Sequence, residues 1–372
     1  MPQNLKSAVP ETVQEGHSLG QATSSSKRLI VSNLESQVRV CPSCGAGVSG
    51  APLEISHESQ LFACHACGLH FWHPVHRPDA LWYEAAYQQR DETEMPLEPG
   101  HRYFLKDPRA PKRGRLLDLG CGVGNFIAAA RDAGFDVTGV ELDPAAARFA
   151  QQHYGLASVF VMRLEEFLAA RPKNCFDIVT FFEVLEHQEN PQAFLDVAKQ
   201  LLAPAGYIAL SVPNRCRWQK GTDPLDYPPN HLTRWSPGAL RAILERNGFE
   251  ILSLCEQPLG ILRAAQVLSM GFRTGLIPRV AGGPPPTLAD LGQLDTEQVR
   301  ATVARVAAQR RHRIAAALAR SKNLAMVPLA ALFLPFLRLR GCKGLYLYSL
   351  ARLRASAASR VPTTGNVRQF GG

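Results

Sequence analysis

Three glycines at alternate positions follow a short apolar run in this 372-residue chain: Gly120, Gly122 and Gly124. The carboxyl group of Asp118 stands two residues before the first of them. Glycine adopts a positive φ without strain, and because it has no Cβ a ligand can approach its backbone closely. A helix that begins near Asn125 would direct its unpaired N–H groups and the positive end of its dipole toward the same place. This pattern predicts a buried parallel strand that breaks into a ligand-binding loop.

A second acid, Glu141, ends the next apolar stretch and lies 17 residues after Gly124. That spacing is expected when a strand–loop–helix–strand unit places a carboxylate on a ribose diol. Residues 176–187 repeat the pattern of a strand followed by acids, and residues 206–214 form a fourth unit. The glycine loop by itself also fits a dinucleotide-binding fold or a structural turn. The repeated units predict an α/β fold with a doubly wound, Rossmann-like sheet.

Two Cys-x-x-Cys pairs stand near the N-terminus with 19 residues between them: Cys41, Cys44, Cys64 and Cys67. Each pair turns two thiolates toward one ion, and two pairs complete the tetrahedral four-sulfur site that suits Zn²⁺. Four protein ligands are typical of a structural site, although a nearby histidine could replace one cysteine. A segment this small has little core, so the metal would supply much of its folding free energy.

Four motifs occur in order along residues 113–260: Asp-x-Gly-x-Gly-x-Gly, Glu-x-Asp-Pro, Phe-Asp-x-Val and Glu-Val-Leu-Glu-His. They resemble the motifs of class I S-adenosylmethionine (SAM)-dependent methyltransferases, in the branch of the ubiquinone-type and bacterial glycan-modifying O-methyltransferases. The cysteine segment resembles a zinc ribbon. The resemblance implies a seven-stranded sheet whose last strand is inserted antiparallel, and residues 250–254 and 344–351 fit the last two strands. The Asn-Pro-Pro-Tyr signature of one class of nitrogen methyltransferases is absent from the sequence.

The same resemblance implies a role for each residue around the cofactor. The glycine loop would pack against the methionine part of SAM, Asp118 would favour its amino group, and Glu141 would accept both ribose hydroxyls. Leu142, Arg163 and Leu164 would flank the adenine, and Phe182 would line the floor of the site. The implied cofactor-binding residues are Asp118, Gly120, Gly122, Gly124, Glu141, Leu142, Leu164 and Phe182.

The methyl acceptor would lie near a Pro-rich loop, residues 226–237, that follows the fourth strand. Ligands of this fold bind at the carboxyl ends of the strands, and the loop leaves that end. His231 is therefore the first candidate for a general base that deprotonates an acceptor hydroxyl, and His187 is the second, because the pKa of histidine suits that task. Asp226 and Glu186 remain further candidates. His231 could instead anchor the loop through backbone hydrogen bonds.

The acids Glu183 and Glu186 and the dipeptide Ser236-Pro237 lead to two further predictions near this loop. Glu183 and Glu186 fit either a functional role or a solvated helix start, where acids complement the helix dipole. Ser236 and Pro237 predict the start of a helix that ends at Gly248, a glycine that suits the position after a helix.

The formal net charge of +9 is unevenly distributed along the chain. From residue 261 onward the chain has 17 Lys and Arg and three acids, a net charge of +14 that leaves −5 for residues 1–260. The basic character therefore belongs to the C-terminal part and not to the expected catalytic core.

A long insertion, residues 261–342, carries much of this charge. It contains a basic helical stretch, 296–322, and then an apolar run, 324–337, that two prolines interrupt. The run is too short to span a bilayer. We interpret the insertion as a lid over the core or as an interfacial membrane element at 296–340.

The expected location follows from three observations. Residues 1–28 are polar and lack the apolar core of a secretory signal. No stretch reaches the 18 apolar residues of a transmembrane helix. The nine cysteines divide into four with metal spacing and five scattered ones, which is typical of a reducing compartment. We therefore expect a cytoplasmic protein, associated with the inner face of a membrane if the insertion contacts lipid.

These features together predict a domain organisation and a function. The expected segments are a disordered tail (1–36), a zinc ribbon (37–80), a helical connector or cap (81–112), the SAM-binding core (113–260), the insertion (261–342), the last strand (343–354) and a second tail (355–372).

The first functional hypothesis is a SAM-dependent O-methyltransferase that acts on a small or lipid-linked polar acceptor, such as a glycan sugar, with Zn²⁺ in a structural role. The alternative is an RNA methyltransferase that recognises its substrate with the zinc ribbon. Nucleic acid is the less favoured partner because the basic stretch lacks the interleaved aromatic residues that stack on bases. A third hypothesis is a non-enzymatic zinc-ribbon protein, against which the complete glycine loop argues. The sequence makes no prediction of oligomeric state.

Overall fold

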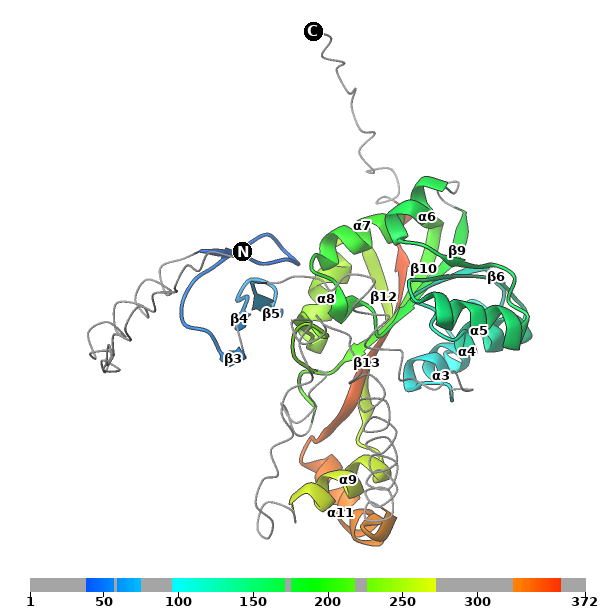
Figure 1. Cartoon of the computed structure of the whole chain (residues 1–372). Coiled ribbons are helices and arrows are strands. Elements are labelled where there is room, and N and C mark those ends of the chain that lie inside the picture. Colours follow the sequence, from blue (N-terminus) through cyan, green and yellow to red (C-terminus); the bar gives the residue numbers. More distant parts are fainter. Residues whose placement is uncertain are drawn as a thin grey trace, which may run out of the picture.

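The computed structural model of the chain describes residues 38–56, 59–74, 96–170, 175–217, 226–271 and 324–355 (Figure 1). The predicted tail at 1–36, residues 81–95 of the predicted connector, the predicted basic helix at 296–322 and residues 356–372 of the second predicted tail lie outside the described residues.

A seven-stranded sheet forms the centre of the molecule. In spatial order its strands are β12 (Phe249–Pro258), β13 (Lys343–Leu353), β10 (Leu202–Pro213), β9 (Phe176–Phe182), β6 (Gly114–Leu119), β7 (Phe135–Glu141) and β8 (Val159–Val161). Neighbouring strands from β10 to β8 are parallel, and β13 runs antiparallel to β10 and β12. The predicted doubly wound sheet with an inserted antiparallel last strand is confirmed.

Helices cover both faces of this sheet (Figure 1). One face carries α3 (Pro99–Lys106), α4 (Asn125–Asp132) and α5 (Pro144–Tyr154), and the other carries α6 (Leu164–Ala170), α7 (Pro191–Leu201) and α8 (Pro237–Arg246). Alternate strand residues supply the two cores, since Leu116 and Ile178 face the first set whereas Leu117 and Val179 face the second.

The helices that follow the strands begin at strong capping signals. The side chains of Asp143, Asn190 and Ser236 each accept a backbone N–H in the first turn of α5, α7 and α8, and a proline follows each of them at the first helical position. The predicted helix after Ser236 is therefore confirmed, and Gly248 follows it with a φ of 82°.

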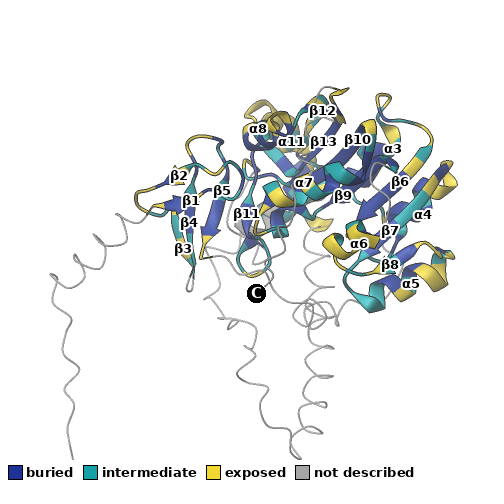
Figure 2. Ribbon diagram, turned by 90° about the horizontal axis from the view of Figure 1, so that it is seen from above, coloured by how far each residue is buried: buried dark blue, intermediate teal, exposed yellow. Residues whose placement is uncertain are grey.

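The N-terminal cysteine segment forms short strands beside the large sheet. They are β1 (Arg39–Val40), β2 (Gly47–Val48), β3 (Glu54–Ser56), β4 (Ser59–Ala63) and β5 (His70–His73). The sheet order β11-β5-β4-β3 includes a strand from elsewhere in the chain, β11 (Thr233–Arg234), which pairs antiparallel with β5 (Figure 2). The sequence predicts a loop up to the helix start at Ser236, with no strand between residues 226 and 235. The structure corrects this, because two of these residues complete the sheet of the cysteine segment.

The insertion contributes two described helices, α9 (Ile261–Gly271) and α11 (Val327–Leu339), which lie side by side away from the sheet (Figure 1). The apolar run is one helix, since Pro328 stands in the first turn of α11, where proline is tolerated, and the helix continues through Pro335. Among the described residues, no helix has the length and apolar character that crossing a membrane requires.

Candidate active site

The glycine loop has the backbone that its sequence predicts. The φ angles of Gly120, Gly122 and Gly124 are 77°, 54° and 83°, all in the left-handed region that favours glycine. A Cβ on Gly120 would lie 2.8 Å from Cγ2 of Val184, so the loop packs against the segment that follows β9. At Gly122, apart from the glycine and its two chain neighbours, no atom of the described residues lies within 4 Å of such a Cβ, which leaves space for a ligand. As predicted, α4 begins at Asn125.

The carboxyl group of Glu141, at the end of β7, accepts three backbone N–H bonds. Its Oε2 accepts from Gly122 at 2.7 Å, and its Oε1 accepts from Leu142 and Asp143 at 2.7 and 2.9 Å. Burial raises the pKa of Glu141, and the three N–H groups oppose that shift because they favour the charged form. A carboxylate offers about four lone-pair positions, so capacity remains for a hydroxyl donor. Its acceptance of both ribose hydroxyls stays a prediction.

Asp118 lies near the end of β6 and is 3% exposed. The Thr180 hydroxyl on β9 donates a hydrogen bond to its Oδ1 at 2.6 Å. Burial raises the pKa of Asp118 to about 8, and the nearby Glu141 adds to that shift, whereas the Thr180 hydroxyl opposes it. An ammonium group beside Asp118 would favour its charged form, which agrees with the role that the resemblance implies.

The other predicted cofactor residues stand at the same edge of the sheet. Leu142 directly follows β7, Leu164 is the first residue of α6, and Phe182 is the last residue of β9. The ring of Phe182 packs 4.8 Å from that of Phe126 on α4. The structure therefore brings all the predicted cofactor residues to the carboxyl ends of β6 to β9, the ligand-binding end of such sheets.

His101 on α3 belongs to this edge although the sequence had placed it only among the residues of a connector. Its ring stacks on Phe126 with centroids 4.9 Å apart and is 9% exposed. The Glu98 N–H donates to its Nδ1 at 3.1 Å, and burial lowers its pKa to about 4. His101 is therefore neutral and carries its proton on Nε2. The spacing of Glu98 and His101 at a helix start was a usable signal.

A second group of side chains converges beside the cofactor edge: Glu186, His187 and His231. One ligand atom from each lies within 4.8 Å of the others. The Nε2 atoms of His187 and His231 are 3.8 and 4.0 Å from Oε1 of Glu186, and the two rings are 4.9 Å apart. Both predicted catalytic histidines therefore lie together, with a carboxyl group between them.

The hydrogen bonding of His187 determines what this group can bind. Its Nδ1 lies 2.6 Å from the carbonyl oxygen of Asn230, and a carbonyl only accepts, so Nδ1 carries the proton. In the neutral ring the Nε2 lone pair then faces the carboxyl oxygen of Glu186. Two acceptors that face each other across such a short distance require a proton or a cation between them.

Glu186 itself has the surroundings of an incomplete site. Its side chain is 1% exposed, and neither carboxyl oxygen has a hydrogen-bond partner among the described residues. Burial raises its pKa far above the usual range. The interpretation of Glu186 as part of a solvated helix start is therefore wrong, because it stands in a buried 3₁₀ turn, η1 (Leu185–His187). Carboxylate and imidazole ligands at these distances fit a divalent cation.

The remaining neighbours of this group are charged or strained. Asp226 forms a buried ion pair with Arg217, and its Oδ1 lies 3.4 Å from Nδ1 of His231, which therefore stands between two acids. Glu183 has a φ of 55°, an uncommon value for a residue with a side chain. The Ser211 hydroxyl donates a hydrogen bond to the carboxyl group of Glu183 at 2.7 Å. Backbone strain of this kind is common at functional sites.

The four cysteines of the N-terminal segment meet in one cluster, as predicted. Their Sγ atoms all lie within 4.8 Å of one another, with 3.7 Å between Cys41 and Cys67 and 3.5 Å between Cys44 and Cys64. A tetrahedral zinc site with bonds of about 2.3 Å separates its sulfurs by about 3.8 Å. The pKa of Cys67 is lowered to about 5 because the Cys41 thiol hydrogen-bonds to it. The sulfur geometry and the donor set therefore fit Zn²⁺.

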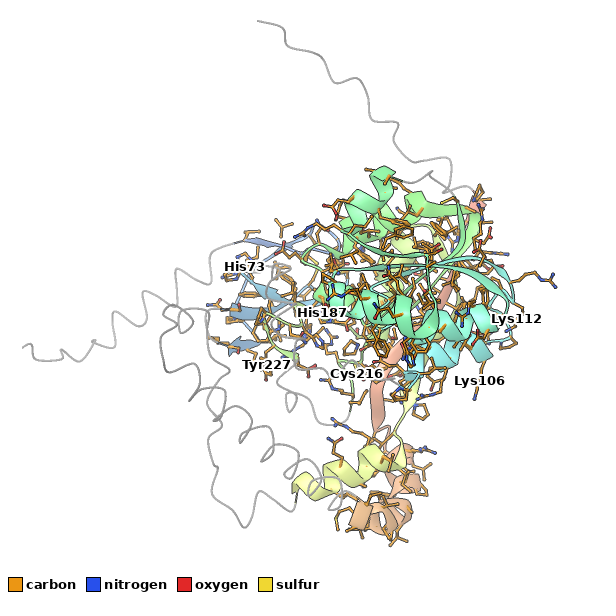
Figure 3. All side chains as sticks on the ribbon, turned by 45° about the vertical axis from the view of Figure 1, so that its right-hand side comes forward. His73, Lys106, Lys112, His187, Cys216 and Tyr227 are labelled. Carbon is orange, nitrogen blue, oxygen red and sulfur yellow. The ribbon has the colours of Figure 1, made fainter. Side chains whose placement is uncertain are left out.

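The cysteine segment and the acceptor loop are connected through the backbone of Leu232. The Trp72 N–H on β5 donates to the Leu232 carbonyl at 3.0 Å, and the Leu232 N–H donates to the carbonyl of Glu186 at 2.8 Å. Leu232 directly follows His231 in the sequence and is hydrogen-bonded to Glu186. This one residue therefore connects the cysteine segment to both Glu186 and His231. Figure 3 shows His187 at the boundary between the cysteine segment and the large sheet.

Side chains reinforce the same connection. The Arg234 guanidinium pairs with Glu54 of β3 at 2.6 Å and lies 5.0 Å from the ring centroids of both Trp72 and Tyr227. Arg246 on α8 donates to the Ser43 hydroxyl at 3.0 Å. These two contacts join residues 180 and 203 positions apart in the sequence, and the sequence alone offered no signal for them.

Comparison with known proteins adds two findings. Residues 87–254 match the family model described as a methyltransferase domain. Among curated proteins, the chain is similar to the ubiquinone biosynthesis O-methyltransferase of Xanthomonas axonopodis pv. citri, 31% identical over 140 residues, covering 36% of this chain and 56% of the relative. It is also similar to the enzyme of that name from Photorhabdus laumondii, 29% identical over 143 residues, covering 36% and 60%. The chain thus spans little more than half the length of these relatives.

Among solved structures, the chain is similar to a putative sarcosine dimethylglycine methyltransferase from Galdieria sulphuraria. The sequence identity is 13% and the TM-score is 0.42, with 74% of this chain and 98% of that one covered.

Proposed function

The chain carries a class I SAM-dependent methyltransferase domain, and on that premise we propose that the protein transfers the methyl group of SAM to a hydroxyl oxygen of a polar acceptor. The observation that carries this proposal is the buried Glu186 carboxyl group. Its oxygens lack hydrogen-bond partners among the described residues, and it faces two histidines beside the glycine loop. This arrangement suits the activation of an oxygen nucleophile.

The cofactor would lie along the carboxyl ends of β6 to β9. Asp118 would pair with the ammonium group of SAM, Glu141 would accept from the ribose, and the space beside Gly122 would receive the methionine part. Helix α4 would contribute its free N–H groups and the positive end of its dipole. On these assignments the sulfonium would lie near Gly120, which packs against Val184, and Val184 stands two residues before Glu186.

We propose that Glu186, His187 and His231 hold a divalent cation that binds the acceptor hydroxyl. When bound, such an ion lowers the pKa of a coordinated hydroxyl group. The three residues would orient the acceptor hydroxyl toward the methyl group of SAM. In the transfer a C–O bond would form as the C–S bond breaks. The bonding electron pair would stay on sulfur and neutralise it, and the acceptor proton would leave to water. His231 and His187 serve as ligands in this scheme, and a His231 general base is the alternative that the sequence suggested.

We further propose that Zn²⁺ occupies the four-cysteine cluster and that the acceptor is a small or lipid-linked polar molecule, such as a glycan sugar. The Sγ distances support the zinc assignment. The contacts of Leu232 and Arg234 support a role for the zinc segment in holding the acceptor loop, rather than a role in chemistry.

The test uses the purified protein, SAM labelled with tritium in its methyl group, and a cell extract depleted of SAM. The extract is separated afterwards into RNA, protein, lipid and water-soluble fractions. Label in the lipid or soluble fraction that disappears with a divalent-metal chelator and returns with Mg²⁺ or Mn²⁺ supports the proposal. Label in RNA supports the alternative of an RNA methyltransferase. Label that persists after the chelator has removed the cation would contradict the proposal of a cation site. His231 would then again be the candidate general base.

A further inference from the structure

The helices α9 and α11 form a projection with a small core of its own. Leu259, Ala264, Ala265 and Ala330 are buried in that core, which is separate from the two cores of the large sheet. Both described helices lie beyond the end of the sheet in Figure 1. The lid interpretation expected their apolar residues to pack on the sheet cores, and the described residues do not do so.

One side of α11 presents large apolar side chains to solvent. The exposed fractions are 74% for Leu332, 44% for Phe333, 52% for Phe336 and 87% for Leu339. Leu332, Phe336 and Leu339 are spaced four and three residues apart, so they lie along one side of the helix. An exposed cluster of large apolar residues on one helix face marks a surface that contacts another apolar phase.

The charges around this cluster have one sign. Residues 259–271 and 324–342 contain three arginines, Arg263, Arg338 and Arg340, and no aspartate or glutamate. The Arg340 guanidinium lies 4.9 Å from the ring centroid of Phe336, so a cation stands at the border of the apolar cluster. Arg338 and Arg340 both stand at the C-terminal end of α11, and apolar side chains that end in arginines suit the boundary between acyl chains and headgroups.

An open groove continues the same surface between the two helices. It is lined by Ile261, Ala331, Leu334, Pro335, Arg338 and Leu339. Five of these six residues are apolar, and the sixth is an arginine. This composition suits an acyl chain whose anionic headgroup contacts Arg338.

The position of the projection relates it to the candidate active site. Both β10 and β12 are antiparallel to β13, so β12 runs in the same direction as the parallel strands. Its last residue, Pro258, pairs with Lys343 at the start of β13. The chain therefore leaves the sheet toward α9, and returns to it from α11, at the carboxyl edge (Figure 1). Asp118 near the end of β6 and Glu186 just after β9 belong to the same edge.

We propose that the α9–α11 projection docks the protein on the surface of an anionic lipid bilayer, with Leu332, Phe333, Phe336 and Leu339 inserted among the acyl chains. The active-site edge would then face the bilayer. Resting on the proposed function, this orientation makes the methyl acceptor a lipid-linked molecule whose polar head stands in the headgroup layer. The docking itself does not depend on the methyl transfer.

The charge of the projection favours an anionic bilayer over two other partners, a second copy of the chain and residues 272–323 of the same chain. A second copy of the chain in a symmetric contact would bring the same arginines together, which costs free energy. Residues 272–323 of this chain hold nine Lys and Arg against three acids, so they would add positive charge to the projection rather than neutralise it. An anionic bilayer neutralises the arginines and buries the apolar side chains at the same time.

The test is flotation of the full-length protein with two kinds of vesicle, phosphatidylcholine alone and phosphatidylcholine with about 30% phosphatidylglycerol. We expect binding to the anionic vesicles that weakens with salt. Replacing Leu332, Phe333, Phe336 and Leu339 together by Ser should lower the partition coefficient more than about a hundredfold. Arg340→Gln should lower it about fivefold on anionic vesicles only.

A matched control is available on the zinc segment, where Leu53 and Ile55 are 57% and 67% exposed. Their replacement by Ser should leave flotation unchanged. The SAM affinity of every variant, measured by calorimetry, shows that the core is folded. Failure of the wild-type chain to float, flotation that the quadruple variant retains, or an apolar-dependent dimer in light scattering would each overturn the proposal. Flotation by a chain without methyl transfer would instead overturn only the proposed function and the lipid-linked acceptor.

Discussion

The cofactor side and the acceptor side of the candidate site meet at one sheet edge but are built in opposite ways. On the cofactor side, Glu141 accepts three backbone N–H bonds from residues near it in sequence or in the adjoining loop. On the acceptor side, Glu186 is more deeply buried than Glu141, since it is only 1% exposed, and its oxygens accept no hydrogen bond from the described residues. The first carboxyl group is held by backbone N–H groups of the protein, whereas the second finds no hydrogen-bond donor among the described residues and is left for a proton or a bound cation.

The two sides also differ in how the chain assembles them. Strand, loop and helix follow one another in the cofactor side, so that it is nearly complete within residues 114–164. The acceptor side combines η1, the loop that carries His231, and a cysteine segment more than a hundred residues earlier. This difference predicts that the acceptor side is the more easily broken of the two.

Loss of the cysteine cluster should have the largest effect. Cys64→Ser removes one of four metal ligands, and the free energy of zinc binding is also the folding free energy of the segment. We expect methyl transfer to fall below detection, because β5 would no longer hold Leu232. The SAM affinity should change less than about threefold, since none of the hydrogen bonds found among the described residues joins a predicted cofactor residue to the segment. Zinc content, calorimetry and the transfer assay check this, with Cys175→Ser as the control.

Glu186→Gln should come next. The substitution keeps the size of the side chain but removes its charge, and we expect kcat to fall about a thousandfold with the SAM affinity unchanged. Glu165→Gln, an exposed acid on α6, is the matched control. Binding of Mn²⁺ measured by electron paramagnetic resonance should be lost in the first variant only. If the Glu186→Gln enzyme had a normal kcat, Glu186 would have no role in the transfer, and its proposed difference from Glu141 would be contradicted.

Glu141→Ala should weaken SAM binding on the cofactor side of the site. Hydrogen bonds to a charged group contribute about 1.5–3 kcal/mol each, and loss of this carboxylate removes contacts to the loop and to the ribose. We expect the Kd of SAM to rise about a hundredfold, with kcat at saturating SAM much less affected. Calorimetric titration measures the Kd, and a Kd within a factor of three of the wild type would contradict the cofactor assignment.

The charge state of Asp118 gives a smaller, pH-dependent effect. Its folded pKa is raised to about 8, so without ligand the carboxyl group is mostly protonated at neutral pH. SAM carries an ammonium group that favours the ionised form, so binding should release a proton, and the affinity should fall up to about tenfold for each pH unit below 8. Asp118→Asn should bind weakly at every pH and show no slope. Calorimetry in buffers of different ionisation enthalpy counts the protons.

Arg234→Met should have the smallest effect. It removes the ion pair with Glu54 and the contacts with Trp72 and Tyr227, while the β5–β11 backbone pairing remains. A pair of this exposure contributes about 1 kcal/mol, so we expect the KM of the acceptor to rise about fivefold. Arg241→Met, which removes an exposed pair within α8, serves as the control. A change in SAM affinity instead would contradict the separation of the two sides.

The same contrast explains how far the sequence could predict the structure. The glycine loop, the end of β7 and the caps of α5, α7 and α8 depend on residues close in sequence, so their patterns indicated them correctly. The carboxyl ends of parallel strands must share an edge, and this brought His187 and His231 to one place. The pairing of β11 with β5 depends on two residues of a Pro-rich loop, too few for a periodic signal. The burial of Glu186 follows from that pairing and was missed with it.

The partnership of β5 and β11 also bears on how the chain is made. Until residue 234 has left the ribosome, β5 is the unpaired edge of a small sheet, with Phe71 and Trp72 among its residues. Exposed edges of this kind invite pairing with other chains. About 160 residues of synthesis separate the two strands, roughly ten to thirty seconds at bacterial or eukaryotic elongation rates. During that interval metal binding would stabilise the nascent segment, and a chaperone could cover the unpaired edge of β5 and prevent aggregation.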